Sequence, residues 1–289
     1  MLLTAETEIL NRLYGDEGAV RAIAEAGFDA VDYSLYGITQ NDDHTVWGQE
    51  YKTLAKTLSE TAKAAGVRFA QAHAPFPSAI TGDDCFNVRI TEKLKRSIEF
   101  AGLLGAEVIC VHPITFENDV RRETEENIKL YRTLAPYARD AGVKIGVENM
   151  FWVDERSDYY RPGACGTAER MIDIYDRLDR DVFTCLLDIG HCGLGGEKPD
   201  EFIRKLGKDR LGALHVHDND NKTDQHTIPF SRNIDWNAVT KALHDIGYAG
   251  NFTFEANTFL VNYPREFVPE ALLFLQKTGR FLISMTEKA

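Results

Sequence analysis

The sequence lacks any apolar run approaching the ~20 residues that a membrane-spanning helix needs, so no such helix is expected. Its five cysteines are an odd number without a paired framework, which is typical of a reducing compartment. Basic residues are the minority, with 33 Lys and Arg against 45 Asp and Glu; the net charge of −12 disfavours general binding to nucleic acid or anionic membranes. Glu6 and Glu8 come too early for a signal peptide, and we expect a cytoplasmic protein.

The chain also has no low-complexity segment and no linker rich in Pro, Gly or Ser, which predicts one domain over residues 1–289. Amphipathic helical stretches alternate with short apolar segments, and a glycine usually separates the two. The apolar segments predict strands at 28–33, 67–72, 108–111, 143–147, 182–187, 211–216 and 251–254, after a weaker first strand at 2–4. Eight strand–helix units favour an α/β fold that is a single (β/α)₈ TIM barrel. An open doubly wound sheet is disfavoured because no G-x-G-x-x-G follows the first strand.

Polar side chains gather where the predicted strands end, which in a barrel is the face that carries the chemistry. The residues at these ends are His73, His112, Glu148, Asp188, His191, His215, His217 and Glu255. Each alone has an ordinary explanation, such as a hydrogen-bonded packing histidine or a solvated rim charge. Together they offer oxygen and nitrogen ligands for a divalent cation such as Mn, Mg, Co or Zn. Without a cation, we expect the converging carboxylates to repel one another and their pKa values to rise.

Four of these residues form the strongest pattern, because Glu148, Asp188, His215 and Glu255 hold equivalent positions on four successive strands. His215 and His217 are two residues apart and so point to the same side of their strand. One can be the metal ligand while the other contacts the substrate or a second metal. The spacing alone does not choose between them.

The motifs that carry these residues resemble the xylose isomerase-like TIM barrels, namely the sugar phosphate isomerase/epimerase family and its relative endonuclease IV. The resemblance rests on Val-Glu-Asn (147–149), Leu-Asp-Ile-Gly-His (187–191), His-Val-His-Asp-Asn-Asp (215–220) and Asp-Gln-His (224–226). It implies that Glu148, Asp188, His215 and Glu255 bind the metal, with His215 preferred because an acid, Asp218, follows three positions later. It implies a metal-dependent isomerase, either a ketose epimerase or an aldose–ketose isomerase, in carbohydrate metabolism. Glu148 and Glu255 would then transfer a proton through a metal-stabilised enediolate of a sugar or sugar phosphate.

The same resemblance leaves other functions open. His73, His112, His191, Asp224 and His226 complete the nine-residue ligand set of an endonuclease IV-like multi-zinc phosphodiesterase, and are candidates for additional metal binding. The acidic chain disfavours a nucleic acid substrate. A metal-dependent dehydratase or lyase acting on a keto-sugar or cyclitol would use the same parts. A sugar-binding subunit without catalysis would leave the paired glutamates without a purpose.

The substrate side of the site is predicted less sharply. His191 matches a substrate-contacting residue of the epimerases, and His217 and Trp152 are further candidates for contact with a sugar. The family's Gly-Glu-Gly-type turn is replaced here by a segment carrying Arg232, which suggests an anionic or polyhydroxyl ligand unless it is an ordinary surface arginine. Arg156 and Arg161 are alternative anion-binding groups. The resemblance is also compatible with a homo-oligomer.

Overall fold

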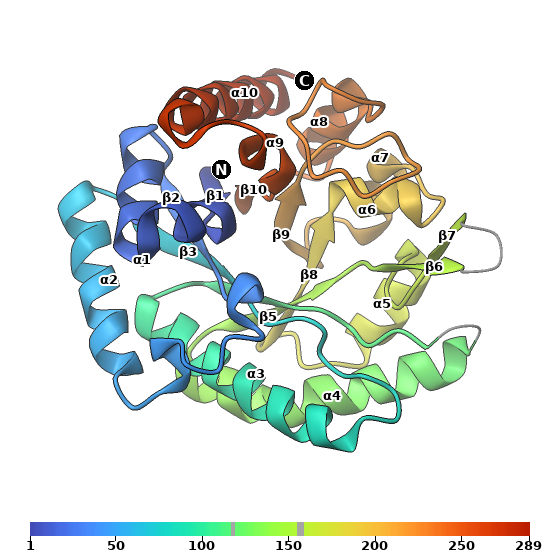
Figure 1. Ribbon diagram of the computed structural model, residues 1–289. Helices are drawn as coiled ribbons and strands as arrows, with labels where there is room; N and C mark the ends of the chain where they lie inside the picture. The colour runs from blue at the N-terminus through green and yellow to red at the C-terminus, as the bar shows by residue number, and fades with distance from the viewer. Residues whose placement is uncertain (117–118, 155–158) are drawn as a thin grey trace.

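The computed structural model describes residues 1–116, 119–154 and 159–289. Eight strands close into a barrel, and neighbouring strands are parallel throughout (Figure 1). In their order around the barrel the strands are β1 (Leu2–Glu6), β10 (Asn251–Phe254), β9 (Leu211–Val216), β8 (Phe183–Asp188), β5 (Lys144–Glu148), β4 (Val108–Val111), β3 (Arg68–His73) and β2 (Ala30–Ser34). The (β/α)₈ architecture predicted from the sequence is confirmed.

Helices surround the barrel and cover its outer surface (Figure 1). The longer ones are α1 (Glu8–Glu25), α2 (Tyr51–Ala65), α3 (Asp84–Leu104), α4 (Val120–Ala141), α5 (Ala168–Asp176), α7 (Pro199–Leu206), α8 (Trp236–Asp245) and α10 (Val268–Lys288). Among the residues that the structure describes, none of these helices is both long and apolar enough to cross a bilayer.

Local sequence signals fix where these helices begin and end. The side chains of Asp83 and Asp119 accept hydrogen bonds from the backbone N–H three residues later, which caps the starts of α3 and α4. Gly66 and Gly105 have φ of 78° and 80° just past α2 and α3, a left-handed conformation that a side chain would oppose. The predicted helix–glycine–strand pattern is therefore confirmed at these turns.

The loops at the carboxyl end of the barrel contain further elements that the sequence pattern missed. An antiparallel hairpin, β6 (Phe151–Asp154) with β7 (Tyr159–Pro162), follows β5, and α6 (Ile189–Leu194) begins directly after β8. Shorter elements are α9 (Asn257–Val261), η1 (Tyr36–Ile38), η2 (Thr45–Trp47) and η3 (Arg265–Phe267). These segments surround the open end of the barrel, where the strand-end side chains point.

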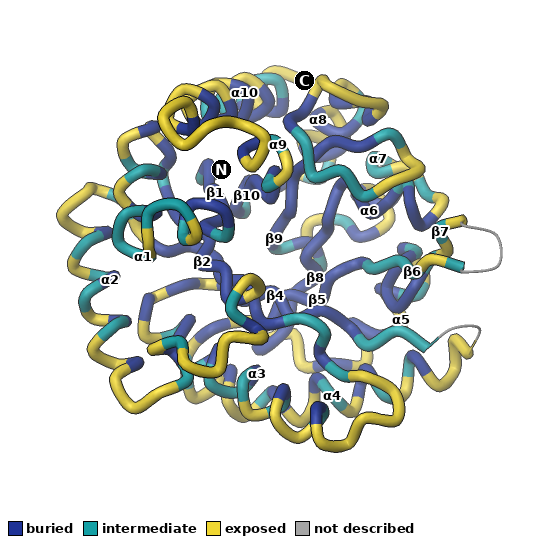
Figure 2. Tube along the Cα trace, viewed as in Figure 1, coloured by how far each residue is buried: buried dark blue, intermediate teal, exposed yellow. Residues whose placement is uncertain are grey.

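The barrel interior changes from apolar to polar along the strands. Most residues of these strands are buried (Figure 2). Val108, Leu186 and Ala213 form a small buried cluster inside the barrel together with Cys110. Gly146 belongs to this layer, because a Cβ added there would lie 3.0 Å from Leu186 Cβ. Apolar side chains thus fill the barrel interior on the amino-terminal side of the strand-end polar residues.

Candidate metal centre

The four expected ligands converge directly above this apolar layer. Glu148, Asp188 and His215 come two residues after Gly146, Leu186 and Ala213, so each points to the same inner side of its strand. Glu255 follows the last residue of β10. Each of the four offers a ligand atom, and these atoms all lie within 4.8 Å of one another. The strand register thus assembles one buried cluster of three carboxylates and an imidazole.

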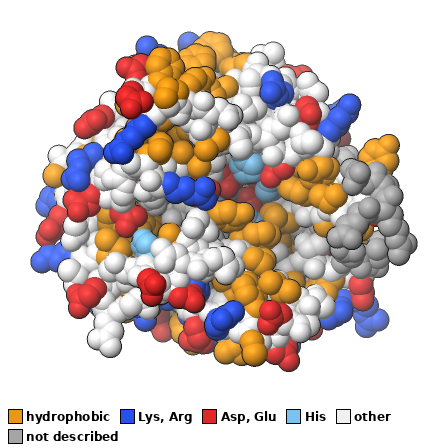
Figure 3. All heavy atoms as spheres, in the orientation of Figure 1, with side chains coloured by type: hydrophobic (Ala, Val, Ile, Leu, Met, Phe, Trp, Pro, Cys, Tyr) orange, Lys and Arg blue, Asp and Glu red, His pale blue; other side chains and the backbone are white. Residues whose placement is uncertain are grey.

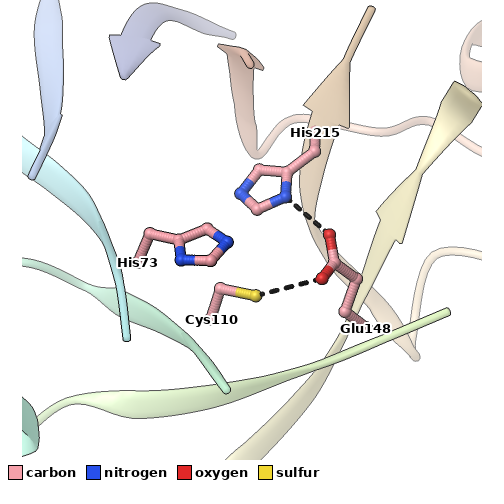
Figure 4. Close-up of side chains that lie close together, drawn as sticks. All are labelled: His73, Cys110, Glu148 and His215. Carbon is pink, nitrogen blue, oxygen red and sulfur yellow. Dashed lines mark hydrogen bonds and ion pairs between the residues drawn. The ribbon is translucent and has the colours of Figure 1, made fainter. Parts of the chain in front are cut away.

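Glu148 lies at the centre of this cluster. Its Oε1 is 2.7 Å from His215 Nδ1, and its Oε2 is 2.7 Å from His112 Nε2. Glu255 Oε2 approaches the same His215 Nδ1 to 3.2 Å. Figure 4 shows Glu148 and His215 facing the space into which His73 and Cys110 also point, with Cys110 Sγ donating to Glu148 Oε2 over 3.4 Å.

The surroundings of the two glutamates shift their pKa values in opposite directions. Burial raises the pKa of Glu255 well above its usual range, as expected for a carboxylate without a cation. Burial also acts on Glu148, but the adjacent His112 and His215 more than offset it and hold its pKa well below the usual range. The expectation that every converging carboxylate has a raised pKa is therefore wrong for Glu148, whose charge His112 and His215 compensate. It is also wrong for Asp188, whose pKa is lowered because His191 and His217 outweigh its burial.

A second cluster lies beside the first and is built from His191, His217, Asp224 and His226, whose ligand atoms also lie within 4.8 Å of one another. His226 Nε2 is 2.9 Å from Asp224 Oδ2, and the rings of His217 and His226 stack at 3.9 Å between centroids. His217 Nε2 lies 3.1 Å from Asp188 Oδ1, so Asp188 borders both clusters. His215 of β9 and His217, directly after its end, thus face the same interior, as their spacing predicts, His215 in the first cluster and His217 in the second.

Hydrogen bonds to the backbone orient several of these side chains. His191 Nδ1 lies 2.9 Å from the carbonyl of Asn149, and His226 Nδ1 lies 2.8 Å from the carbonyl of Glu255. Asp188 caps α6 by accepting the backbone N–H of His191 over 2.8 Å. Fixing one ring nitrogen or one carboxylate oxygen in this way aims the other at the centre of the site.

Buried polar atoms that lack any hydrogen-bond partner test whether this site fits a metal. Among the residues that the structure describes, they include Asp188 Oδ2, Asp224 Oδ1, and the Nε2 atoms of His73 and His191. Leaving so many buried donors and acceptors unsatisfied is costly, and a cation would compensate several of them at once. The mixed carboxylate and imidazole ligands suit Mn, Mg, Co or Zn. The residues present therefore fit a divalent metal.

A pocket of about 400 Å³ opens onto both clusters. His112, His191, Asp224, His226 and Glu255 line it. Its walls are formed by Glu8, Tyr36, Phe76, Met150, Phe151, Asn257 and Thr258. Figure 3 shows histidine and acidic side chains in a hollow at the middle of this face. A ligand of sugar size would meet polar groups on the floor and aromatic rings at the sides.

Two substrate candidates from the sequence lie elsewhere. Phe151, not Trp152, lines the pocket, with its ring 5.0 Å from that of His191, because alternate residues of β6 point to opposite sides. Arg232 is exposed and donates to Gln225 Oε1 over 3.1 Å, which makes it a rim residue and not part of the pocket lining. Arg161 lies 3.8 Å from Asp154, and Arg156 lies outside the described residues.

The sequence reasoning missed Asp32 in the middle of β2. It is fully buried, its Oδ2 lies 3.6 Å from His215 Nε2, and it accepts a hydrogen bond from Gln71 Nε2 over 3.1 Å. Glu6, at the end of β1, was missed as well; burial and the nearby Asp32 and Glu8 raise its pKa to about 7. Each is an acid on a mostly apolar predicted strand, and that departure from the apolar pattern was the signal that could have found it.

Comparisons with known proteins match this architecture. An uncharacterized protein of Methanocaldococcus jannaschii is 32% identical over 192 residues, which cover 63% of this chain and 62% of that protein. A D-psicose 3-epimerase of Ruminiclostridium cellulolyticum is 26% identical over 57% of this chain and 53% of its own length. The crystal structure of a D-tagatose 3-epimerase-like protein covers 100% of this chain and 99% of its own, with a TM-score of 0.78 and 23% identity.

The family model described as the xylose isomerase-like TIM barrel matches residues 20–278. That span runs from α1 to α10 and includes every residue of both clusters. By fold and by sequence, the chain belongs to the xylose isomerase-like TIM barrel family.

Proposed function

We propose that this protein is a divalent-metal-dependent isomerase or epimerase that acts on a sugar or sugar phosphate. The observation that carries the proposal is the buried set of Glu148, Asp188, His215 and Glu255, whose ligand atoms lie within 4.8 Å of one another beside a pocket of about 400 Å³. The relatives named as sugar epimerases support the same class of reaction.

The reaction must remove a weakly acidic proton next to a carbonyl and return it. When bound, a divalent cation would supply Lewis-acid stabilisation to the oxygen that becomes negative. Glu148 and Glu255 flank His215 from β5 and from the end of β10, which are separated in the barrel by β8 and β9. One glutamate takes the proton as a carboxylate, and the other, as a carboxylic acid, donates its own proton to the enediolate. Donation to the opposite face of the same carbon inverts that carbon, and donation to the neighbouring carbon moves the carbonyl group.

The pocket residues orient the sugar for this transfer. His191 Nε2 has no hydrogen-bond partner among the described residues, while its Nδ1 is 2.9 Å from the carbonyl of Asn149, so Nε2 can bond to a substrate hydroxyl. Phe76, Phe151 and Tyr36 provide ring surfaces against which the C–H faces of a sugar pack. These walls also limit the access of water to the enediolate.

The second cluster favours one other candidate function. His191, His217, Asp224 and His226 would let the site hold more than one zinc ion, as a multi-zinc phosphodiesterase requires. The pocket that the described residues form has no Lys or Arg in its lining, although binding to a nucleic acid backbone needs several such contacts. We therefore rank this function second.

Metal content and substrate turnover separate the two. Protein purified without chelator or affinity-tag metal is analysed by mass spectrometry of the elements, then assayed with ketoses, their phosphates and abasic-site DNA. About one Mn, Co or Mg per chain with turnover of a ketose supports the proposal. Two or three Zn per chain with DNA cleavage would replace it by the second candidate. Absence of metal binding after reconstitution would overturn both.

A further inference from the structure

Phenylalanines spaced seven residues apart are exposed on the outer face of α10 and at the residue directly before it. Phe267, Phe274 and Phe281 are 49%, 57% and 55% exposed, although the opposite face of the helix already packs Leu272, Leu275, Leu282 and their neighbours into the core. A surface helix normally presents polar residues on its outer side. This helix is apolar on two faces, so one of them lacks a partner within the described residues.

Neighbouring elements enlarge this surface. Phe230, in the loop between β9 and α8, lies 6.0 Å from Phe281 between ring centroids, and Tyr263 lies 5.4 Å from Phe267. A groove of about 460 Å³ separates the Phe230 loop from α10 and is lined by Phe274 and Phe281. We call Phe230, Tyr263, Phe267, Leu273, Phe274 and Phe281 the α10 patch. Figure 2 shows this side of α10 exposed, and Figure 3 shows hydrophobic side chains gathered over it.

Phe230 adopts φ of 72°, in the left-handed region that a bulky side chain disfavours. Its ring is nevertheless 52% exposed. The loop is thus held in an unfavourable conformation that presents an aromatic ring to the outside, next to the helix patch.

The size of the patch matches one half of a dimer interface. With ~200 Å² for an aromatic side chain, the exposed fractions of its members amount to on the order of 500 Å² of mostly apolar surface. A standard interface buries about 800 Å² per partner, of which roughly 65% is apolar in homodimers. The patch therefore supplies about the apolar area that a stable homodimer needs.

We propose that the α10 patch is a self-association surface, on which a second copy of this chain packs its own α10 in antiparallel orientation. A two-fold axis near Phe274 places Phe267 against the partner's Phe281, because these two residues lie equally far from Phe274 along the helix. Glu270 and Lys277 lie on the same exposed stripe, four residues before and three residues after Phe274. In the antiparallel pair, Glu270 comes beside the partner's Lys277, and the symmetry repeats that contact.

The charges distinguish this partner from the alternatives. A parallel arrangement would place Glu270 beside the partner's Glu270, and the like charges would repel. An anionic lipid surface would require a cluster of basic residues around the apolar ones, but this stripe carries Glu266 and Glu270 beside Lys277, on a chain of net charge −12. The proposal does not depend on the reaction that the barrel catalyses.

Analytical ultracentrifugation of the full chain over a range of concentrations tests the self-association. The wild type is expected at twice the mass of the chain, and Phe274→Glu at the mass of the chain with an unchanged circular dichroism spectrum. Val88→Glu is the matched control, because Val88 is 67% exposed on α3 and lies outside the patch. A monomeric wild type, a dimeric Phe274→Glu variant, or binding to anionic vesicles without self-association would overturn the proposal.

Charge reversal tests the antiparallel register. Glu270→Lys and Lys277→Glu should each raise the dimer dissociation constant tenfold or more, because each change brings like charges together twice. The double variant restores both contacts and should return to within about threefold of the wild type. Weakening by each single change without recovery in the double variant would overturn the antiparallel register.

Discussion

The two ends of the barrel treat their charged residues in opposite ways. At the amino end, Asp29 forms a bidentate pair with Arg280, with two 2.7 Å contacts, and Arg68 lies 2.9 Å from Glu107. These groups are partly exposed and pair with one another. At the carboxyl end, Asp188 and the neighbouring His191 and His217 are buried, and several polar atoms of this region have no hydrogen-bond partner among the described residues.

This difference assigns stability to the amino end of the barrel and ligand binding to its carboxyl end. Paired, solvated charges cost little and join the strands to the outer helices, so the amino end is built to fold. Buried, unsatisfied charges destabilise a fold unless a ligand compensates them, so the carboxyl end is built to bind. Substitutions at the two ends should consequently differ in which property they change.

The largest effect is expected for Glu148→Gln. The amide cannot serve as a proton acceptor and is a poorer metal ligand, so turnover of the ketose substrate should fall by a factor on the order of 10³ or more. The fold should persist, because glutamine has the same shape and can still bond to His112 or His215. Steady-state kinetics and circular dichroism check this, with Glu107→Gln at the amino end as the control. Near-normal turnover by Glu148→Gln would remove it from the reaction.

Removal of the metal should have the next largest effect, on stability. A cation at 100 times its dissociation constant stabilises the native state by about 2.7 kcal/mol. For a chain of this size, that corresponds to a fall in Tm of roughly 4–5 °C when a chelator removes the cation. Scanning calorimetry with and without chelator measures the change. Identical Tm values for the two samples would mean that the buried clusters do not hold a cation.

Asp32→Asn should act on the metal indirectly. Asp32 faces His215 Nε2 at 3.6 Å, on the side of the ring away from Glu148 and Glu255, and so favours the orientation in which Nδ1 faces the cluster. Loss of such a supporting carboxylate typically weakens metal affinity by about 10–100-fold. Competition with a chelating dye measures that affinity. Unchanged affinity together with a lower kcat would show that Asp32 contributes to the reaction without positioning His215.

The convergence of the candidate ligands at the strand ends was predictable because two physical periodicities locate these residues. The helix–glycine–strand repeat places the strand ends, and the period of two places Glu148, Asp188 and His215 on the inner side. The involvement of Asp32 was not predictable in this way, because it depends on a contact across the barrel between β2 and β9, which are separated by β1 and β10.

The loop residues were the least predictable part of the site. The sequence shows aromatic residues after β5 but not the hairpin that turns Phe151 toward His191 and leaves Trp152 out of the pocket lining. The position of Arg232 depends in the same way on loop contacts, since its backbone N–H and side chain bond to Asp218 and Gln225. Local propensity does not encode such contacts between segments.

The smallest effect is expected for Asp29→Asn, at the residue directly before β2 and three residues before Asp32. The hydrogen bonds from Arg280 lower the pKa of Asp29 in the folded protein below its ordinary value of 3.8, so the ionised form stabilises the fold. Solvent screens this partly exposed pair, and its loss should lower the free energy of unfolding by only about 0.5–1 kcal/mol at pH 7. Because the folded pKa is the lower one, the difference between wild type and variant should be full above the unfolded pKa and disappear as the pH falls through the folded pKa. Urea unfolding at several pH values measures it, while metal affinity and turnover stay unchanged. A variant that kept its stability but lost metal affinity would contradict the division of labour between the two ends of the barrel.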